Sequence, residues 1–185
     1  MHTVSKNLED YETRVAADNT IEVKWVVRRH TFDYENPTHI KALIDNYGRL
    51  YEYFREKPDT YGRAMLLDFD RYRAMCNFSE LRSFILDKRL EQVPVAETRE
   101  LILRDFGIEF TDKHISYILS VEIPKKIVEE VKKARLLDDC PPSTWKKCYT
   151  CGKSFPRDLL FFTRNNSRKD GFSSNCKECE RIKRL

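Results

Sequence analysis

The sequence predicts a mainly α-helical protein that ends in a small module held together by four cysteines. Two observations lead to this expectation. Apolar residues recur at three- and four-residue spacing from residue 37 to residue 134, as they do along the buried face of a helix. Two Cys-x2-Cys pairs then follow within about the last forty residues, a spacing typical of metal-binding modules.

Composition limits the classes of protein that fit. The chain has 185 residues, of which 41% are hydrophobic and 35% charged, with only 5 Gly and 7 Pro. We therefore expect a globular protein without long disordered tracts. No apolar run approaches the roughly 20 residues that cross a bilayer, so we expect no membrane partner. The first residues precede no apolar stretch. We therefore expect no secretory signal and a cytoplasmic location, where cysteines bind metals more readily than they form disulfides.

Residues 1–35 are expected to form an N-terminal arm or strand. Residues 20–28 alternate apolar and polar side chains and are rich in β-branched types, which favours a strand. No second strand is evident as a partner. An extended arm, or part of a helix, therefore remains an alternative for this segment.

Residues 36–139 are expected to form a helical domain of six helices, each marked by a cap or by proline. The first runs from Pro37 to before Pro58, the second covers residues 61–76, the third follows Ser79, the fourth runs from Pro94 to near Gly107, the fifth follows Thr111, and the sixth begins at Pro124. The aromatic side chains spaced through residues 32–84 are expected to fill the core of this domain, because aromatic rings dominate core packing.

The fourth and fifth helices, over about residues 94–121, have the features of a helix-turn-helix, with Gly107 in the turn and a cap at Thr111. If Ile115 faces the core, the side chains that face outward and could contact DNA are Lys113, His114, Ser116 and Tyr117. The turn is about two residues longer than the compact form, and residues 91–140 carry eight basic against eleven acidic side chains. A three-helix fold used only for packing or for protein contact therefore remains open.

A stiff linker is expected at residues 140–146, because Cys140-Pro-Pro-Ser-Thr cannot continue a helix. This places a domain boundary between the helical domain and a module at residues 147–185.

The four expected metal ligands are Cys148, Cys151, Cys176 and Cys179. Two residues between cysteines let both sulfurs reach one ion from a tight turn, and Gly152 stands where the first turn must bend. Four thiolates suit one tetrahedral Zn²⁺, and a closed shell leaves no position for a catalytic water, so the zinc is expected to be structural. Redox Cys-x-x-Cys motifs usually come singly, and iron–sulfur ligands usually place three cysteines close together. The expected fold is a zinc ribbon or a treble-clef-like module.

The C-terminal segment is also the basic part of the chain. Residues 141–185 carry eleven basic and four acidic side chains, a balance of +7, which favours polyanion binding. The residues expected to contact nucleic acid here are Lys146, Lys147, Arg164, Arg168, Lys169, Lys177, Arg181, Lys183 and Arg184. Residues 161–176 mix aromatic, arginine and amide side chains, which suits phosphate contacts and base stacking. The alternative is a solvated loop beside a zinc-held core. The small core expected for this module consists of Phe155, Leu159, Leu160, Phe161, Phe162 and Phe172.

Residues from about Trp25 to the end resemble a group of phage and prophage proteins with a helical part, a helix-turn-helix and a zinc ribbon. The segments that carry the resemblance are Asp105-Phe-Gly-Ile, His114-Ile-Ser-Tyr, Glu122-Ile-Pro-Lys-Lys-Ile127 and the cysteine module with Phe161-Phe and Lys169-Asp-Gly-Phe. The first three look like the final region of sigma-type factors. The module is distantly similar to the zinc-binding half of phage recombination endonucleases, but residues 152–175 contain no histidine, so nuclease activity is not implied.

The sequence therefore predicts a phage-derived, zinc-containing nucleic-acid-binding protein that acts in transcription control. DNA is the expected partner rather than RNA, with RNA polymerase or another phage protein as a further partner. The first alternative is a structural or interaction adaptor in which zinc only stabilises the fold, and the second is a nuclease accessory without a catalytic site. No Ser/His/Asp set, carboxylate pair or phosphate loop is evident, so we do not expect an enzyme.

Overall fold

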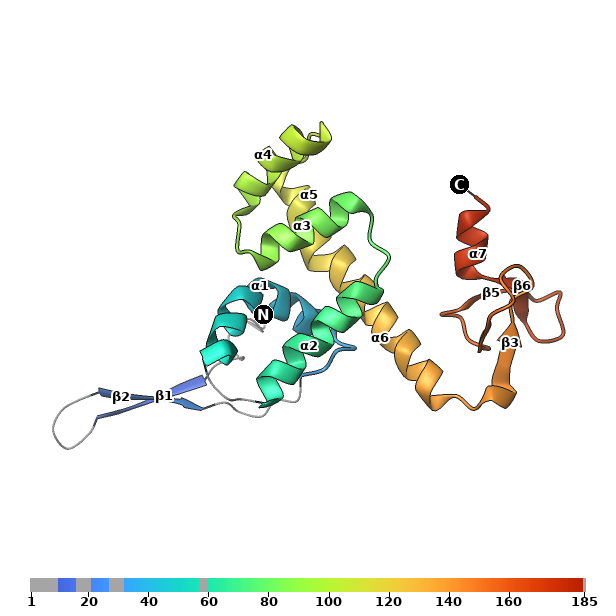
Figure 1. The fold of residues 1–185 in the computed structure, drawn as a ribbon, viewed down its shortest axis with the longest axis horizontal. Helices are drawn as coiled ribbons and strands as arrows, with labels where there is room; N and C mark the ends of the chain where they lie inside the picture. Colours follow the sequence, from blue (N-terminus) through green and yellow to red (C-terminus); the bar gives the residue numbers. More distant parts are fainter. Residues whose placement is uncertain (1–9, 16–20, 27–31, 57–59, 185) are drawn as a thin grey trace.

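The computed structural model describes residues 10–15, 21–26, 32–56 and 60–184. It confirms a mainly helical fold with small two-stranded sheets and a four-cysteine cluster near the C-terminus (Figure 1). No helix among the described residues is both long and apolar enough to cross a membrane.

The N-terminal strand has a partner that the sequence did not reveal. Strands β1 (Asp10–Val15) and β2 (Ile21–Val26) pair antiparallel, with Tyr11 opposite Trp25. The strand expected over residues 20–28 is thus confirmed for Ile21–Val26, and the flanking residues of that prediction lie outside the described part of the chain. The partner was missed because the segment is short and charged at every second position, with Tyr11 and Val15 as its apolar residues.

The first four helices form where the sequence predicts them. They are α1 (Pro37–Glu56), α2 (Thr60–Met75), α3 (Glu80–Leu90) and α4 (Val95–Phe106). Ser79 caps α3 by accepting a hydrogen bond from the Arg82 N–H. Gly107 ends α4 in the left-handed conformation, with φ of +67°, which glycine adopts without the steric cost of a Cβ.

The expected separation of the fifth and sixth helices is wrong. Helix α5 (Asp112–Tyr117) continues through a π-helical turn, η2 (Ile118–Glu122), into α6 (Ile123–Asp139), and the joining residues all keep right-handed helical angles. Pro124 has no N–H to donate to Ser120, and its ring would clash with that carbonyl in a regular α-helix. The wider turn, in which the Ile123 N–H bonds to the Ile118 carbonyl, accommodates the proline without ending the helix.

One apolar core joins these helices. Helix α1 packs against α2, α3 and α6, and α4 packs against α3 and α5. The core side chains with almost no exposure are Ile40, Leu43, Ile44, Phe69, Ile85, Leu86, Ile102, Ile115, Ile123, Ile127 and Val131. At the edge of this core, the Arg89 guanidinium bonds to Asp45 at 2.9 Å and joins α3 to α1. Arg82 likewise bonds to Glu122 at 2.7 Å and joins α3 to η2.

The C-terminal module begins directly after α6. A short 3-10 turn, η3 (Pro142–Thr144), leads into two hairpins and a final helix (Figure 1). Strand β3 (Trp145–Lys147) pairs with β4 (Ser154–Pro156), β5 (Phe162–Arg164) pairs with β6 (Phe172–Cys176), and α7 (Lys177–Ile182) closes the module. Trp145 anchors its start by donating its indole N–H to the Cys140 carbonyl.

This module has a second, smaller core. Phe161 and Phe162 are buried among the cysteines, and Leu136 and Leu137 of α6 pack against the same cluster. The last turns of α6 therefore belong to the helical domain by secondary structure and to the module by packing.

Candidate metal centre

The first cysteine pair stands in the turn between β3 and β4. The Cys148 N–H donates to the Lys153 carbonyl at 2.8 Å, and the Gly152 N–H donates to the Cys148 carbonyl at 3.0 Å. Gly152 has φ of +70°, so a side chain at this position would strain the turn. These bonds fold the chain back sharply enough for Cys148 and Cys151 to offer their sulfurs to the same point.

The second pair stands where β6 meets α7. Cys176 ends the strand with an extended backbone and precedes the first helical residue, and Cys179 lies in the first turn of α7. The Lys177 N–H donates to the Phe161 carbonyl at 2.8 Å, which ties the start of the helix to the buried aromatic pair. The strand-to-helix junction thus places the second two sulfurs on one side of the chain.

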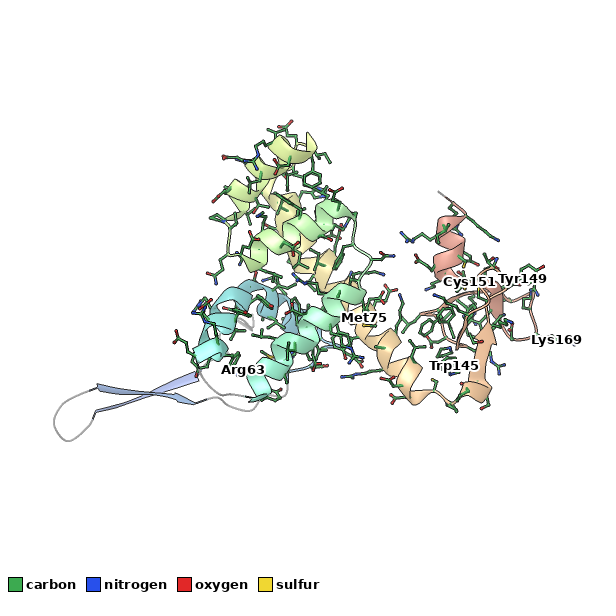
Figure 2. The ribbon with its side chains drawn as sticks, viewed as in Figure 1. Arg63, Met75, Trp145, Tyr149, Cys151 and Lys169 are labelled. Atoms are coloured by element: carbon green, nitrogen blue, oxygen red, sulfur yellow. The ribbon has the colours of Figure 1, made fainter. Side chains whose placement is uncertain are left out.

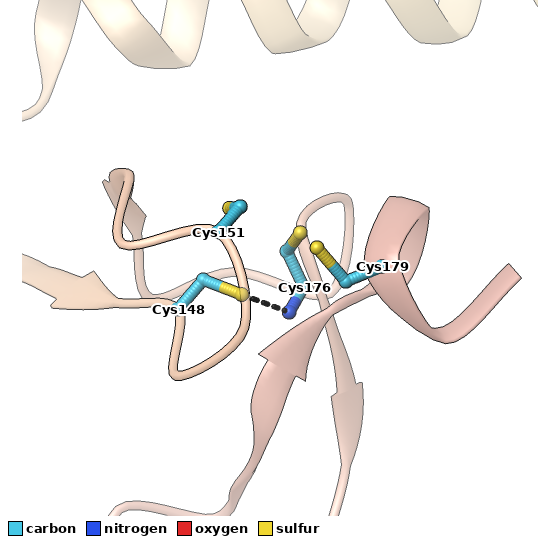
Figure 3. A group of neighbouring side chains, drawn as sticks. All are labelled: Cys148, Cys151, Cys176 and Cys179. Carbon is cyan, nitrogen blue, oxygen red and sulfur yellow. Dashed lines mark hydrogen bonds between the residues drawn. The ribbon is translucent and has the colours of Figure 1, made fainter. Parts of the chain in front are cut away.

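The two pairs come together into one cluster (Figure 3). The four sulfur atoms all lie within 4.8 Å of one another, and Cys148, Cys176 and Cys179 are buried while Cys151 is exposed. A tetrahedral ion with Zn–S bonds of roughly 2.3 Å requires sulfurs about 3.8 Å apart. The donor set and its spacing therefore fit one metal ion, and the sequence prediction of the four ligand positions agrees with this geometry.

Backbone N–H groups stabilise the thiolate form of Cys148. Burial alone raises the pKa of Cys148, but N–H groups of Cys151, Cys176 and Thr150 more than offset it and lower the pKa to about 6. One of these bonds runs from the Cys176 N–H to the Cys148 Sγ at 3.2 Å (Figure 3). The neighbouring thiol of Cys176 raises the pKa of Cys179 to about 12. Four thiolates therefore need a cation between them to be charged together.

Most basic side chains of the module are free to meet a partner. Among the described residues, no ion pair is formed by Lys147, Arg164, Arg168, Lys169, Lys177, Lys183 or Arg184, and all seven are exposed. Two expected contact residues are engaged instead. Lys146 bonds to Asp170 at 2.6 Å and lies over the Phe162 ring, and Arg181 pairs with Glu178 at 2.6 Å.

The aromatic residues expected to offer base stacking belong to the core. Phe161 and Phe162 are buried, and Phe172 packs against them. The exposed ring in this module is Tyr149, with 88% of its surface accessible. Sequence reasoning missed Tyr149. The available signal was its position between two ligand cysteines, where a turn points its intervening side chains outward.

The four residues expected on the outer face of α5 are exposed, and Ile115, Ile118 and Leu119 are buried as the helical phase requires. His114 stacks on Phe110 with ring centroids 4.4 Å apart. The nearby arginines are neutralised, since Arg99 pairs with Asp112 at 3.1 Å and Arg104 with Asp105 at 2.6 Å.

No protein-family model matches the sequence, and neither a curated protein nor a solved structure matches it significantly.

Proposed function

We propose that this protein binds one structural Zn²⁺ through Cys148, Cys151, Cys176 and Cys179 and uses the surrounding basic module to bind DNA. The zinc assignment is supported by an all-sulfur, four-ligand set, which zinc prefers. The order of the elements supports a treble-clef-like fold for the module. A cysteine turn is followed by a hairpin, and a helix then supplies the second pair of ligands from its start. When bound, the ion supplies folding energy to a core too small to hold by itself.

DNA binding rests on a single observation, namely that nine basic side chains of the described module are exposed and form no ion pair. Unpaired lysines and arginines release counterions when they meet phosphates, which drives binding to DNA of any sequence. A second exposed surface is the corner between α4 and α5. We propose that it acts as a helix-turn-helix in transcription control, in keeping with the resemblance to phage proteins and a cytoplasmic location in a bacterial host.

Zinc binding by the cysteines and DNA binding by the basic side chains can each be tested on the full chain. We expect one zinc per chain by elemental analysis, and its loss in Cys151→Ser. We expect Arg168→Glu with Lys169→Glu to weaken DNA binding and to make the slope of log K against log salt shallower by about 0.9 for each lost phosphate contact. The control is Arg49→Glu with Arg71→Glu, which makes the same charge change at exposed residues of α1 and α2. Iron in place of zinc, or equal effects of both double variants, would contradict the proposal.

A second candidate function is protein binding by the corner between α4 and α5. Leu103, Ile108 and Tyr117 are exposed there, and acidic residues outnumber basic ones over residues 91–122. Such a surface suits a partner that is both apolar and basic better than it suits phosphates. If Lys113→Ala with Tyr117→Ala leaves DNA affinity unchanged but abolishes binding to RNA polymerase or another phage protein, this second function is the correct one.

A further inference from the structure

The side chain of Tyr149 is exposed and does not contribute to the core of the described module. Its side chain is 88% accessible, and no ring contact or side-chain hydrogen bond holds it among the described residues. Its backbone, in contrast, is fixed, because the Tyr149 N–H donates to the Ser174 carbonyl at 2.9 Å and the neighbouring residue Cys148 belongs to the buried cysteine cluster. A rigid turn therefore presents a large apolar ring to solvent.

The surroundings of this ring are polar and basic. Lys147 and Lys153 flank the cysteine turn and are both exposed without an ion pair in the described structure. Within the turn, the Thr150 hydroxyl donates to the Asn175 side-chain oxygen of β6 at 2.8 Å. Figure 2 shows Tyr149 and Lys169 on the side of the module that faces away from α6. Cations that can contact phosphates therefore lie around an aromatic face.

We propose that Tyr149 is a stacking platform for an unpaired base, so that the module binds single-stranded DNA in preference to duplex DNA. This inference rests on the proposed function, because the phosphate contacts must bring the strand to the turn. Every base has a π-face that can stack on an aromatic ring. In a duplex those faces are covered by neighbouring base pairs, whereas in a single strand they are available.

The buried phenylalanines strengthen this assignment. Phe161 and Phe162 are fixed in the module core and cannot reach a base without unfolding it. Among the described residues of the module, the other strongly exposed apolar side chains are aliphatic, namely Leu159 and Ile182. Tyr149 is thus the residue whose chemistry and position suit base stacking.

The test compares four zinc-loaded full-length proteins: the parent chain, Tyr149→Ala, Tyr149→Phe, and Arg168→Glu with Lys169→Glu. Each is titrated at several salt concentrations against a fluorescent 20-mer of oligo(dT) and against a 20-base-pair duplex. We expect Tyr149→Ala to lose roughly tenfold in affinity for oligo(dT) and little for the duplex, while Tyr149→Phe retains the affinity of the parent. Zinc content is measured in every sample, so that any loss of fold is recognised.

The outcomes separate this inference from the proposed function. If the charge variant loses affinity for both probes while Tyr149→Ala loses none, DNA binding stands and the stacking role is overturned. Equal losses on oligo(dT) and duplex in Tyr149→Ala would also overturn it, and so would failure of phenylalanine to substitute. If the charge variant binds both probes as the parent does, the proposed function itself fails.

Discussion

Burial and neighbours divide the six cysteines into groups with different chemistry. Four lie together near the C-terminus, where backbone N–H groups stabilise at least the Cys148 thiolate. Cys76 is buried on the inner face at the end of α2, within the helical core, and Cys140 is half-buried at the end of α6. Spacing alone identified the first group, whereas the environment of the other two depends on packing.

Cys76 should be unreactive in the native protein. Burial, with a smaller contribution from Glu130, raises the pKa of its thiol to about 12, and only the thiolate reacts with alkylating agents. At pH 8, about one thiol in ten thousand is then ionised. With zinc bound, we expect iodoacetamide to modify about one cysteine per chain, Cys140, and Cys140→Ser to abolish this modification. Mass spectrometry counts the adducts. Rapid labelling of Cys76 without denaturant would show that α2 does not cover it.

At the scale of the elements, close approach decides how the helices pack. Gly62 in α2 faces the Phe54 ring of α1, and a Cβ built on this glycine would lie 2.2 Å from the ring. Arg63 strengthens the same junction by donating to the carbonyls of Phe54 and Arg55 at the end of α1. The close packing of α2 against the end of α1 therefore requires glycine at position 62.

We expect Gly62→Ala to destabilise the protein by about 1–2 kcal/mol. Overpacking costs about 1–3 kcal/mol, which exceeds the gain of about 1 kcal/mol that alanine brings to a helix. The free energy of unfolding is measured by urea titration monitored by circular dichroism. Adding Phe54→Leu should restore part of the loss, because it removes the ring edge. Ala64→Gly is the control, because at this exposed position of the same helix it changes only the intrinsic helix propensity. Stabilisation by Gly62→Ala would mean that α1 and α2 do not approach so closely.

At the scale of the whole molecule, α6 connects two cores. Its first half contributes Ile127 and Val131 to the helical core, and Leu136 and Leu137 near its end pack on the cysteine cluster. Lysines and glutamates line the helix between these groups, with Lys133 bonded to Glu129 at 2.8 Å and to Glu130 at 2.9 Å. The cysteine cluster thus packs against the end of this helix as well as against the rest of the module.

Removal of the metal should therefore also destabilise the last turns of α6. We expect chelation to unfold residues 147–180 and also to expose the backbone amides of residues 136–140, because their apolar partners are lost. The amides of residues 123–131 should stay protected, since they belong to the other core. Hydrogen exchange with and without a chelator measures both effects. Protection of residues 136–140 that survives chelation would mean that the helix end is stable without the module.

The sequence by itself determined the four cysteines that cluster, the boundaries of α1 to α4 and the buried phase of α5. These features depend on local signals, since caps, prolines, helical periodicity and cysteine spacing act over a few residues. Tertiary structure decided the rest. Pro124 marks a helix start in sequence, but packing on both sides keeps the helix continuous through a π turn. Lys146 is one basic residue among many in sequence, but in the fold it pairs with Asp170, 24 residues away. Phe162 was expected in the core of the module and is buried there, but only the fold exposes Leu159, which was expected beside it, and Tyr149. Such outcomes depend on contacts between distant parts of the chain, which no local pattern records.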